Sequence, residues 1–322
     1  MISIQEMTHK HTRELDIFFN EHHDRCTLCG RDFADGDTSH LGYIKNREQA
    51  LLCDECSRQL KETVVRYHWM KRVYEVPAPT DLLWRYMDLS KFIFLIEKQE
   101  LFFSVAKNFS DPFEGAKGIE TRKDKWDSFY TEFFKKAILT IPEADPMRFS
   151  EEELSSEAQR LLFDLHLGGQ AARDYTFINC WHLSSYESEA MWRLYAKDIT
   201  NAIAIQTTFQ RLYEALYKEP TIAIGKIQYI DFSKRFTSVN DAFWYKQKSF
   251  DHEKEVRLVA VDNARRGQPG VSFPIDINLL IESIYVSPYA PLWFYDVVES
   301  ILDKYCLGKS ILQSQMKAIP FY

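Results

Sequence analysis

The chain has 322 residues, of which 45% are hydrophobic and 27% charged, and its net charge is −7 at pH 7. This composition is typical of a globular protein with an ample core, and the negative charge argues against wholesale electrostatic binding of nucleic acid, although not against a local basic patch. No apolar run approaches the ~18 residues that a membrane-spanning helix needs, and the N-terminal stretch lacks the apolar centre of a secretory signal. We therefore predict a cytoplasmic protein with no membrane partner.

The first feature along the chain is two pairs of cysteines, Cys26 with Cys29 and Cys53 with Cys56, each pair spaced by two residues. A two-residue gap lets both thiolates of a pair turn toward one ion, and Gly30 adds a permissive backbone after the first pair. Two such pairs predict a closed, tetrahedral, structural Zn²⁺ site, in a stretch that resembles a zinc ribbon or a treble-clef knuckle. Four unrelated cytosolic thiols are the alternative.

Three histidines, His22, His23 and His40, lie near the cysteines in the sequence and are expected to be solvated loop residues, although one could replace a cysteine ligand. Residues 57–72 are then predicted to form a helix, in which five basic side chains outnumber one glutamate. Such a helix could bind the phosphates of a nucleic acid or contact a protein. It could equally be a solvated helix whose apolar side packs on the module.

The stretch VPAPT, residues 76–80, is predicted to be an extended linker, because its prolines end a helix. It divides the chain into a zinc-binding module, residues 1–75, and a larger domain, residues 76–322. A charged, mostly helical insertion, broken by residues 141–146, occupies about residues 120–172 of the larger domain. Short strands alternate with helices elsewhere, without the long Val/Ile-rich strands of a parallel doubly wound sheet. We predict an α+β fold with a mixed, largely antiparallel sheet and flanking helices.

The predicted elements of the larger domain follow in chain order. Strands are predicted at residues 81–87, 101–104, 175–183, 201–209, 221–231, 252–261, 281–288 and 309–317, and the run at 252–261 begins with Glu253 and Glu255. Helices are predicted at residues 89–100, 187–198, 210–219, 239–252 and 291–305. The chain has no GxGxxG, Walker A or GxSxG motif, so dinucleotide-binding Rossmann, P-loop and α/β-hydrolase folds lack their signatures.

Four segments together resemble a bacterial family known as domain of unknown function 2971: WRYM (84–87), LFFSVAKNFSDPFEG (101–115), CWHLSSYESEAMWRLYAKDITNAIAIQTT (180–208) and YKQKSFDHEKEVRL (245–258). Members of that family carry these pieces in this order, and Ser110 stands here where they have the Asn of an NDP motif. The order is also similar to that of ADP-ribosyltransferases. In those enzymes a first strand carries Arg or His, a cleft loop carries a serine or an aromatic residue, and a late strand carries a glutamate.

The resemblance implies an enzyme that consumes NAD, either transferring ADP-ribose to a macromolecule or hydrolysing NAD. Cleavage of the bond between nicotinamide and ribose develops positive charge on the sugar, which a nearby carboxylate stabilises. Glu255 is the main catalytic candidate because it enters a predicted strand where burial begins, and Glu253 could serve instead or orient the acceptor. Arg257 shares their predicted face and would hold them or bind phosphate. A solvated ion pair at a strand edge is the alternative.

The other candidates for contact with NAD lie on earlier elements. Arg85 suits a bidentate contact with pyrophosphate or ribose, and Ser104 would form a cleft wall. Rings that could contact nicotinamide or adenine belong to Tyr86, Trp181, His182, Trp192 and Tyr195. The structural alternatives are an Arg85 side chain lying over Tyr86, a Trp192–Tyr195 helix face in the core, and a hydrogen-bonded structural His182. Asp111 and Glu114 are expected to be turn and cap residues.

Two hypotheses of different classes follow. In the first, the protein is an NAD-consuming enzyme whose zinc module selects the target. In the second, it is a non-catalytic zinc protein that binds nucleic acid or another protein, with the larger domain as a scaffold. The first requires that Arg85, Ser104 and Glu255 line one cleft.

Overall fold

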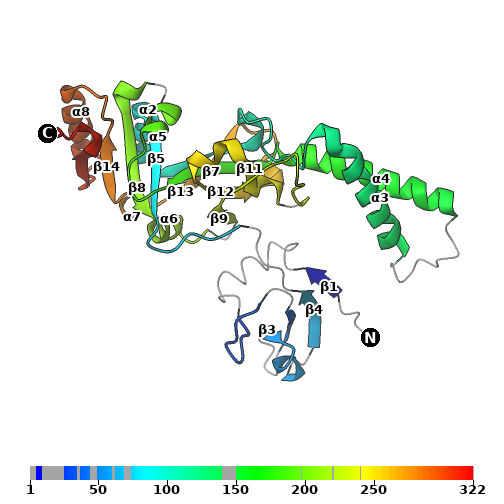
Figure 1. Cartoon of the computed structure of the whole chain (residues 1–322). Coiled ribbons are helices and arrows are strands. Elements are labelled where there is room, and N and C mark those ends of the chain that lie inside the picture. The colour runs from blue at the N-terminus through cyan, green and yellow to red at the C-terminus, as the bar shows by residue number, and fades with distance from the viewer. Residues whose placement is uncertain are drawn as a thin grey trace. The chain divides into compact units, whose positions relative to one another are not determined.

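The computed structural model describes residues 5–8, 25–34, 37–43, 49–59, 62–68, 74–139, 150–196, 198–219, 221–239 and 241–321. The chain forms two compact units, Met1–Val73 and Tyr74–Tyr322. They part between Val73 and Tyr74, slightly before the division that the prolines suggested. Each unit is built around its own sheet (Figure 1).

The first unit contains a four-stranded sheet in the order β1-β4-β2-β3, formed by β1 (Gln5–Thr8), β2 (Thr38–Tyr43), β3 (Gln49–Cys53) and β4 (Glu62–His68). One turn of 3₁₀ helix, η2 (Cys56–Gln59), follows β3. The predicted helix at residues 57–72 is therefore wrong. Its centre, Thr63-Val64-Val65, is a β-branched run that suits a strand, and β2 provides the antiparallel partner.

The second unit contains a nine-stranded sheet with the order β13-β6-β7-β5-β8-β14-β15, to which β12 adds by pairing with β7 and β9. Its strands are β5 (Leu82–Asp88), β6 (Glu100–Val105), β7 (Thr176–Leu183), β8 (Ala202–Thr208), β9 (Ile222–Lys226), β12 (Glu255–Val261), β13 (Gly270–Pro274), β14 (Ser283–Val286) and β15 (Ser310–Gln313). The described pairs in this sheet are antiparallel except β14 with β15. The predicted α+β fold with a largely antiparallel sheet is confirmed.

The helices of the second unit are α2 (Leu89–Lys98), α3 (Lys123–Leu139), α4 (Glu151–Ala172), α5 (Glu189–Tyr195), α6 (Phe209–Ala215), α7 (Ile277–Leu280) and α8 (Leu292–Lys304). Single turns of 3₁₀ helix are η3 (Ala106–Asn108), η4 (Glu120–Arg122), η5 (Ile199–Asn201), η6 (Ala242–Trp244), η8 (Asn263–Arg265) and η9 (Gln315–Lys317), and η7 (Lys248–Glu253) is longer. In the part of the chain that the structure covers, none of the helices combines the length and the apolar character that crossing a membrane requires.

The predicted helical insertion contains α3 and α4, which run side by side (Figure 1). Ser150 begins α4 through a capping box with Glu153, and the predicted break at residues 141–146 lies outside the described residues. The helix predicted at residues 239–252 is wrong. Two short 3₁₀ segments flank a strand there, β11 (Tyr245–Gln247), which pairs with β10 (Gln228–Ile230). Tertiary pairing has overridden the helical pattern.

The main core lies against one face of the large sheet. The helix α2 contributes Phe92, Leu95 and Ile96 to it, and α8 contributes Phe294 and Val298. The strand β12 contributes its alternate residues, Val256, Leu258 and Ala260. Because side chains alternate along a strand, Glu255 and Arg257 lie on the opposite face of β12.

Candidate functional site

The large sheet splits beside β7, and this split creates the cavity of the second unit. One edge of β7 pairs with β12 along residues 176–182. The other edge pairs with β6 at Phe177 and Ile178 and with β5 at His182 and Leu183. Residues 179–181 therefore face a gap between β5 and β6. A cavity of about 760 Å³ occupies this gap and is lined by residues of β5, α2, β6, β7 and α5, by Glu253, and by Glu255 at the start of β12.

Most of the predicted catalytic and NAD-binding residues line this cavity. Eight of them line it: Arg85, Tyr86, Ser104, Trp181, His182, Tyr195, Glu253 and Glu255. Arg85 donates to Asn179, whose side chain points to one face of the sheet. Glu255 pairs with His182 on the neighbouring strand β7, and these two side chains point to the other face. Arg85 and Glu255 line the same cavity because the gap between β5 and β6 opens through the sheet. Arg85, Ser104 and Glu255 therefore meet the geometric requirement of the enzyme hypothesis.

Arg85 carries a half-buried charge with no carboxylate partner among the residues that the structure describes. Its Nη1 donates to Oδ1 of Asn179 and to the carbonyl oxygen of Cys180, both at 2.8 Å, and its guanidinium lies 5.8 Å from the ring centre of Trp181. Burial lowers the pKa of Arg85, but an arginine remains protonated at neutral pH. Because this half-buried cation lines the cavity and has no carboxylate beside it among the described residues, the cavity favours an anionic ligand.

Asn179 is a residue that the sequence did not single out. Its Oδ1 accepts from Arg85 and from Nε1 of Trp181, and its Nδ2 donates to the carbonyl oxygen of Phe102 at 2.7 Å. One side chain thus connects β5, β6 and β7 across the split. An asparagine in the middle of an apolar strand is the signal that could have identified it, because a buried polar side chain needs partners.

Two aromatic rings in the cavity were also not predicted. Phe94 of α2 and Phe102 of β6 line the cavity, yet 40% and 44% of their surfaces are exposed. The predicted Trp181 also lines it but is almost fully buried. An exposed ring in a cavity offers a flat apolar surface for a planar ligand group. Phe94 and Phe102 are therefore better placed for stacking than Trp181.

Glu253 and Glu255 share one lysine. Lys246 of β11 donates from Nζ to Oε2 of Glu253 and to Oε2 of Glu255, the second at 3.3 Å. The prediction that Glu253 belongs to the strand is wrong, because Lys254 adopts a left-handed conformation (φ 41°) and the strand begins at Glu255. The expected difference in burial is also small, since 8% of Glu253 and 3% of Glu255 is exposed. Lys246, predicted to be helical, is a functional candidate that the sequence did not reveal.

Arg257 binds the carboxylate oxygen of Glu255 that Lys246 does not contact. Its Nε donates to Oε1 of Glu255 at 2.7 Å, Nη1 donates to Glu114 and to the carbonyl oxygen of Phe243, and Nη2 donates to Oε2 of Glu114 at 3.0 Å. All its nitrogens are engaged, and Arg257 does not line the cavity. The structure thus places Arg257 behind Glu255 and outside the cavity, as expected for the alternative in which it holds the glutamate. Glu114, predicted to be a turn residue, is a buried partner instead.

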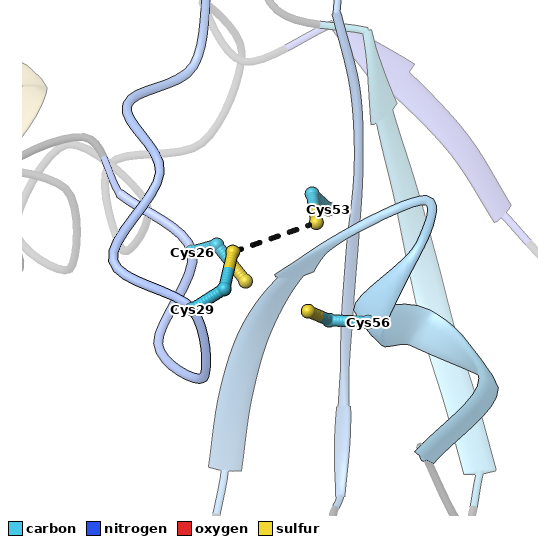
Figure 2. A group of neighbouring side chains, drawn as sticks. All are labelled: Cys26, Cys29, Cys53 and Cys56. Atoms are coloured by element: carbon cyan, nitrogen blue, oxygen red, sulfur yellow. Dashed lines mark hydrogen bonds between the residues drawn. The ribbon is translucent and has the colours of Figure 1, made fainter.

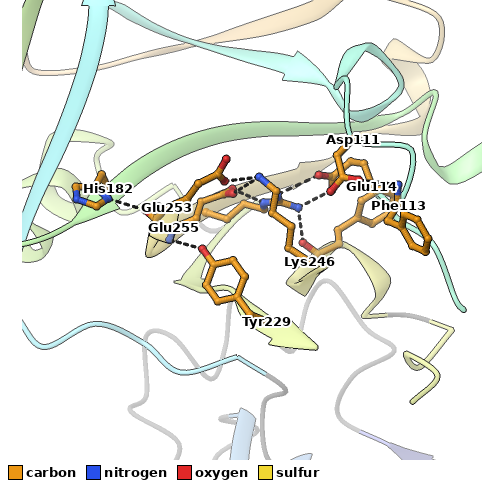
Figure 3. A network of polar contacts seen from close by, with 10 residues as sticks. Asp111, Phe113, Glu114, His182, Tyr229, Lys246, Glu253 and Glu255 are labelled. Atoms are coloured by element: carbon orange, nitrogen blue, oxygen red, sulfur yellow. Dashed lines mark hydrogen bonds and ion pairs between the residues drawn. The ribbon is translucent and has the colours of Figure 1, made fainter. Parts of the chain in front are cut away.

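The result is a chain of alternating charges, Glu114–Arg257–Glu255–Lys246–Glu253 (Figure 3). Burial alone would raise the pKa of Glu255, but Arg257 and Lys246 lower it to about 2. Burial would likewise lower the pKa of Lys246, yet Glu255 and Glu253 raise it. Glu255 is consequently an ionised carboxylate at neutral pH, in a site from which most water is excluded.

The remaining predicted residues divide between the cavity and the core. His182 donates from Nδ1 to the carbonyl oxygen of Glu253 at 2.6 Å, and burial lowers the pKa of its ring. Tyr86 accepts from the backbone N–H of Ser188. Trp192 is fully buried and does not line the cavity, because its ring packs edge-on against Tyr86 and its Nε1 donates to Glu187. The prediction that Trp192 contacts the ligand is wrong, and the core alternative is correct.

The four cysteines of the first unit converge (Figure 2). The ligand atoms of Cys26, Cys29, Cys53 and Cys56 all lie within 4.8 Å of one another, and Sγ of Cys29 is 3.9 Å from Sγ of Cys53. A tetrahedral Zn²⁺ with Zn–S bonds of ~2.3 Å sets its sulfur atoms about 3.8 Å apart. The cluster therefore has the donor set and spacing of a four-thiolate metal site.

Two hydrogen bonds join the first cysteine turn to β3. The first turn is closed by hydrogen bonds from Cys26 N to Arg31 O and from Gly30 N to Cys26 O, with Gly30 in the left-handed region (φ 71°). Thr27 N donates to Leu51 O, and Leu51 N donates to Oγ1 of Thr27. The first turn is thereby bound to β3, which ends at Cys53.

The chemistry of the thiols also fits a bound cation. Burial opposes ionisation of Cys26, but the backbone N–H groups of Cys29, Cys53 and Leu28 lower its pKa to about 7. Burial and the neighbouring thiols raise the pKa of Cys56 to about 12. Several thiolates can coexist at this spacing only with a cation between them.

His40 differs from the prediction of a solvated loop residue. It lies on β2 and is buried, with Nε2 2.5 Å from Oδ1 of Asp54. Asp54 belongs to the second cysteine turn, so His40 stabilises that turn from outside the sulfur cluster. His22 and His23 lie outside the described residues.

No protein-family model matches the sequence, so membership of the family known as domain of unknown function 2971 stays a prediction. No curated protein matches it either. Among solved structures, Thermus sp. 2.9 DarT in complex with NAD⁺ has 11% identity and a TM-score of 0.32, and the match covers 76% of this chain and 100% of that one. Thermus sp. 2.9 DarT in complex with ADP-ribosylated ssDNA has 12% identity and a TM-score of 0.32, with 77% and 98% covered. Likeness at this level carries no argument about the activity of this chain.

Proposed function

We propose that the cavity binds NAD and that the protein cleaves the bond between nicotinamide and ribose, transferring ADP-ribose to a macromolecule or to water. The observation that carries the proposal is that Arg85, Ser104 and Glu255, from three different strands, line one cavity. Its volume of about 760 Å³ is in the range of small-molecule sites. Arg85, a cation with no carboxylate partner among the described residues, and the ionised Glu255 line the same cavity, and this combination favours a dinucleotide over a simple anion or cation.

The charges assign an orientation to the dinucleotide. The pyrophosphate binds Arg85, whose planar fork suits two phosphate oxygens. The nicotinamide ribose lies toward Glu255 and Glu253, where a positive charge is stabilised most strongly. The exposed rings of Phe94 and Phe102 offer a surface to the adenine at the other end.

In the proposed reaction the C–N bond to nicotinamide breaks, and the bonding electrons leave with nicotinamide. The ribose carries the resulting positive charge, which Glu255 stabilises as an anion already in place before the bond breaks. The acceptor oxygen or nitrogen then bonds to the ribose carbon and releases its proton. Glu253, on the same lysine as Glu255, is placed to take this proton.

The first unit would hold structural Zn²⁺ through its four cysteines and contact the target, which is a nucleic acid or a protein. A bound Zn²⁺ would stabilise the two cysteine turns by linking them through its four ligands. The residues predicted as a basic helix form a strand and a 3₁₀ turn, so any contact with phosphates would come from these elements.

The test is incubation of the full-length protein with NAD labelled in the adenosine part, measuring nicotinamide release and labelled macromolecule with and without nucleic acid. Glu255→Gln keeps the volume and removes the charge, and we expect turnover to fall by about two orders of magnitude or more. Glu253→Gln should leave more NAD cleavage and mainly reduce transfer to the acceptor. Glu299→Gln, an exposed position on α8, is the matched control.

Full turnover in Glu255→Gln would contradict the role of this carboxylate. A wild-type protein that shows no turnover with any acceptor, but carries metal and binds nucleic acid or protein, would favour the non-catalytic hypothesis.

A further inference from the structure

The second unit begins with a segment that packs on the elements holding Glu255. Tyr74 stacks on Trp244 of η6, with ring centres 3.9 Å apart and an interplanar angle of 26°. Glu75 follows and pairs with Lys226 of β9 twice, through Lys226 N to Glu75 O at 2.8 Å and through Nζ to Oε1 at 2.7 Å. Residues 74 and 75, just before the stretch expected to be a free linker, are thus bound to two separate parts of the second unit.

A glycine on β9 makes room for the Tyr74 ring. A Cβ atom built on Gly225 would lie 2.1 Å from Cδ2 of Tyr74, far closer than two carbon atoms can approach. The ring of Tyr74 therefore lies directly on the backbone of β9 at Gly225. The same ring stacks on Trp244, so Tyr74 lies between β9 and η6.

Both of these elements position the catalytic candidates. On one side, β9 pairs with β12, and Ile227 N donates to the carbonyl oxygen of Glu255 at 2.9 Å. On the other side, η6 is continued by β11, which carries Lys246, and the carbonyl oxygen of Phe243 accepts from Arg257. The ring of Tyr74 therefore contacts β9, which pairs with the strand of Glu255, and η6, which leads into the strand of Lys246.

We propose that Tyr74 is a positioning residue for the reaction: its ring sets the separation of β9 and η6 and thereby holds Lys246 at Glu255. This inference rests on the proposed function. Tyr74 is also the first residue of the second unit, directly after Val73 of the first.

The first experiment compares Tyr74→Ala with the conservative Tyr74→Phe, which keeps the stacked ring. We expect kcat to fall about tenfold to a hundredfold in Tyr74→Ala, since a misplacement of ~1 Å has an effect of this size, with the Kd for NAD unchanged. Tyr74→Phe should keep kcat close to that of the wild type. Gly225→Ala should reproduce the loss with Tyr74 in place, whereas Gly168→Ala, where no atom lies within 4 Å of the added carbon, should not.

A double variant tests whether Tyr74 acts on the reaction through Lys246. If Tyr74 acts through the lysine, Tyr74→Ala combined with Lys246→Met should be no slower than Lys246→Met alone. Additive losses, or a Tyr74→Ala protein with wild-type kcat, would overturn the proposal.

Hydrogen–deuterium exchange separates this proposal from the proposed function, because it needs no turnover. Peptides covering residues 242–256 should exchange faster in Tyr74→Ala than in Tyr74→Phe, while α8 stays unchanged. If the wild type proves inactive, this exchange result still supports the positioning role. Equal exchange in the two variants would overturn it.

Discussion

The cysteine cluster and the cavity differ in how their residues are brought together. The cysteines come from two short turns within residues 26–56, the first closed by its own backbone and the second held by side-chain contacts of Ser57 and His40 with Asp54. The charges of the cavity depend on partners as distant as Glu114 and Arg257, which are 143 residues apart. Local spacing is sufficient to identify the first kind of site. The second kind exists only when the sheet has formed, so its stability and its chemistry are linked.

The largest effect should come from removing metal, since apparent binding energies of structural zinc are about 10–16 kcal/mol. We expect one Zn²⁺ per chain, lost in Cys26→Ser but retained in Cys306→Ser, whose thiol is outside the cluster. Chelation should unfold the first unit while the second keeps its unfolding transition. Metal analysis gives the content, and limited proteolysis shows which unit opens. Reduced, freshly purified protein without zinc would contradict the assignment.

The next largest effect should follow from breaking the buried charge chain. Arg257→Met leaves Glu114 and Glu255 without their cation in the interior, and loss of one partner of a buried pair costs about 3–5 kcal/mol. Urea unfolding of the second unit measures this loss. Arg265→Met is the control, because Arg265 is exposed and pairs with Asp262 at 3.5 Å, and such surface pairs contribute about 0–1 kcal/mol.

The double variant Glu114→Met/Arg257→Met sharpens the comparison. Replacing a buried pair by apolar residues is often neutral, so the double variant should be more stable than Arg257→Met alone. Equal losses would mean that the site tolerates an unpaired Glu114 and that the charge chain is not a unit.

Features that depend on local sequence could be predicted, whereas features that depend on contacts between distant residues could not. The antiparallel α+β fold, the cysteine cluster and the positions of Arg85, Ser104 and Glu255 in one cavity followed from local patterns and motif order. Lys246 could not be predicted, because its strand forms only through pairing with β10. The role of Glu114 was also hidden, since a glutamate beside an Asp-Pro turn has an adequate local explanation as a cap.

A smaller effect is expected from Arg85, whose hydrogen bonds are to neutral groups. Arg85→Gln removes the charge, and a charged hydrogen bond contributes about 1.5–3 kcal/mol, so we expect the Kd for NAD to rise about tenfold to a hundredfold. The fold should survive, because Arg85 is half-buried and has no carboxylate partner among the described residues, so its removal leaves no buried charge unpaired. Calorimetric titration measures the affinity, and Arg160→Gln on the exposed face of α4 is the control. Unchanged affinity would place the pyrophosphate elsewhere.

The smallest effect concerns pH and separates Glu255 from an ordinary surface carboxylate. Arg257 and Lys246 lower the pKa of Glu255 to about 2 in spite of burial, from an unfolded value of 4.5. A carboxylate with a lowered folded-state pKa contributes stability that is fully present above its unfolded value and is lost as the pH falls toward the folded value. The contribution of Glu255 should therefore persist at pH 5 and disappear as the pH falls toward 2.

The pH dependence of turnover between pH 7 and 8 should also reflect the charge states of Glu255 and His182. Glu255 stays ionised throughout, and burial lowers the pKa of His182 below its usual 6.5, so neither group changes charge between pH 7 and 8. We expect kcat/KM to vary less than about threefold over that range, because a pH profile bends only near the pKa of an essential group. In Lys246→Met the pKa of Glu255 should rise, and the acid limb should move to higher pH. An inflection above pH 7 that disappears in His182→Asn would contradict a neutral histidine in the cavity.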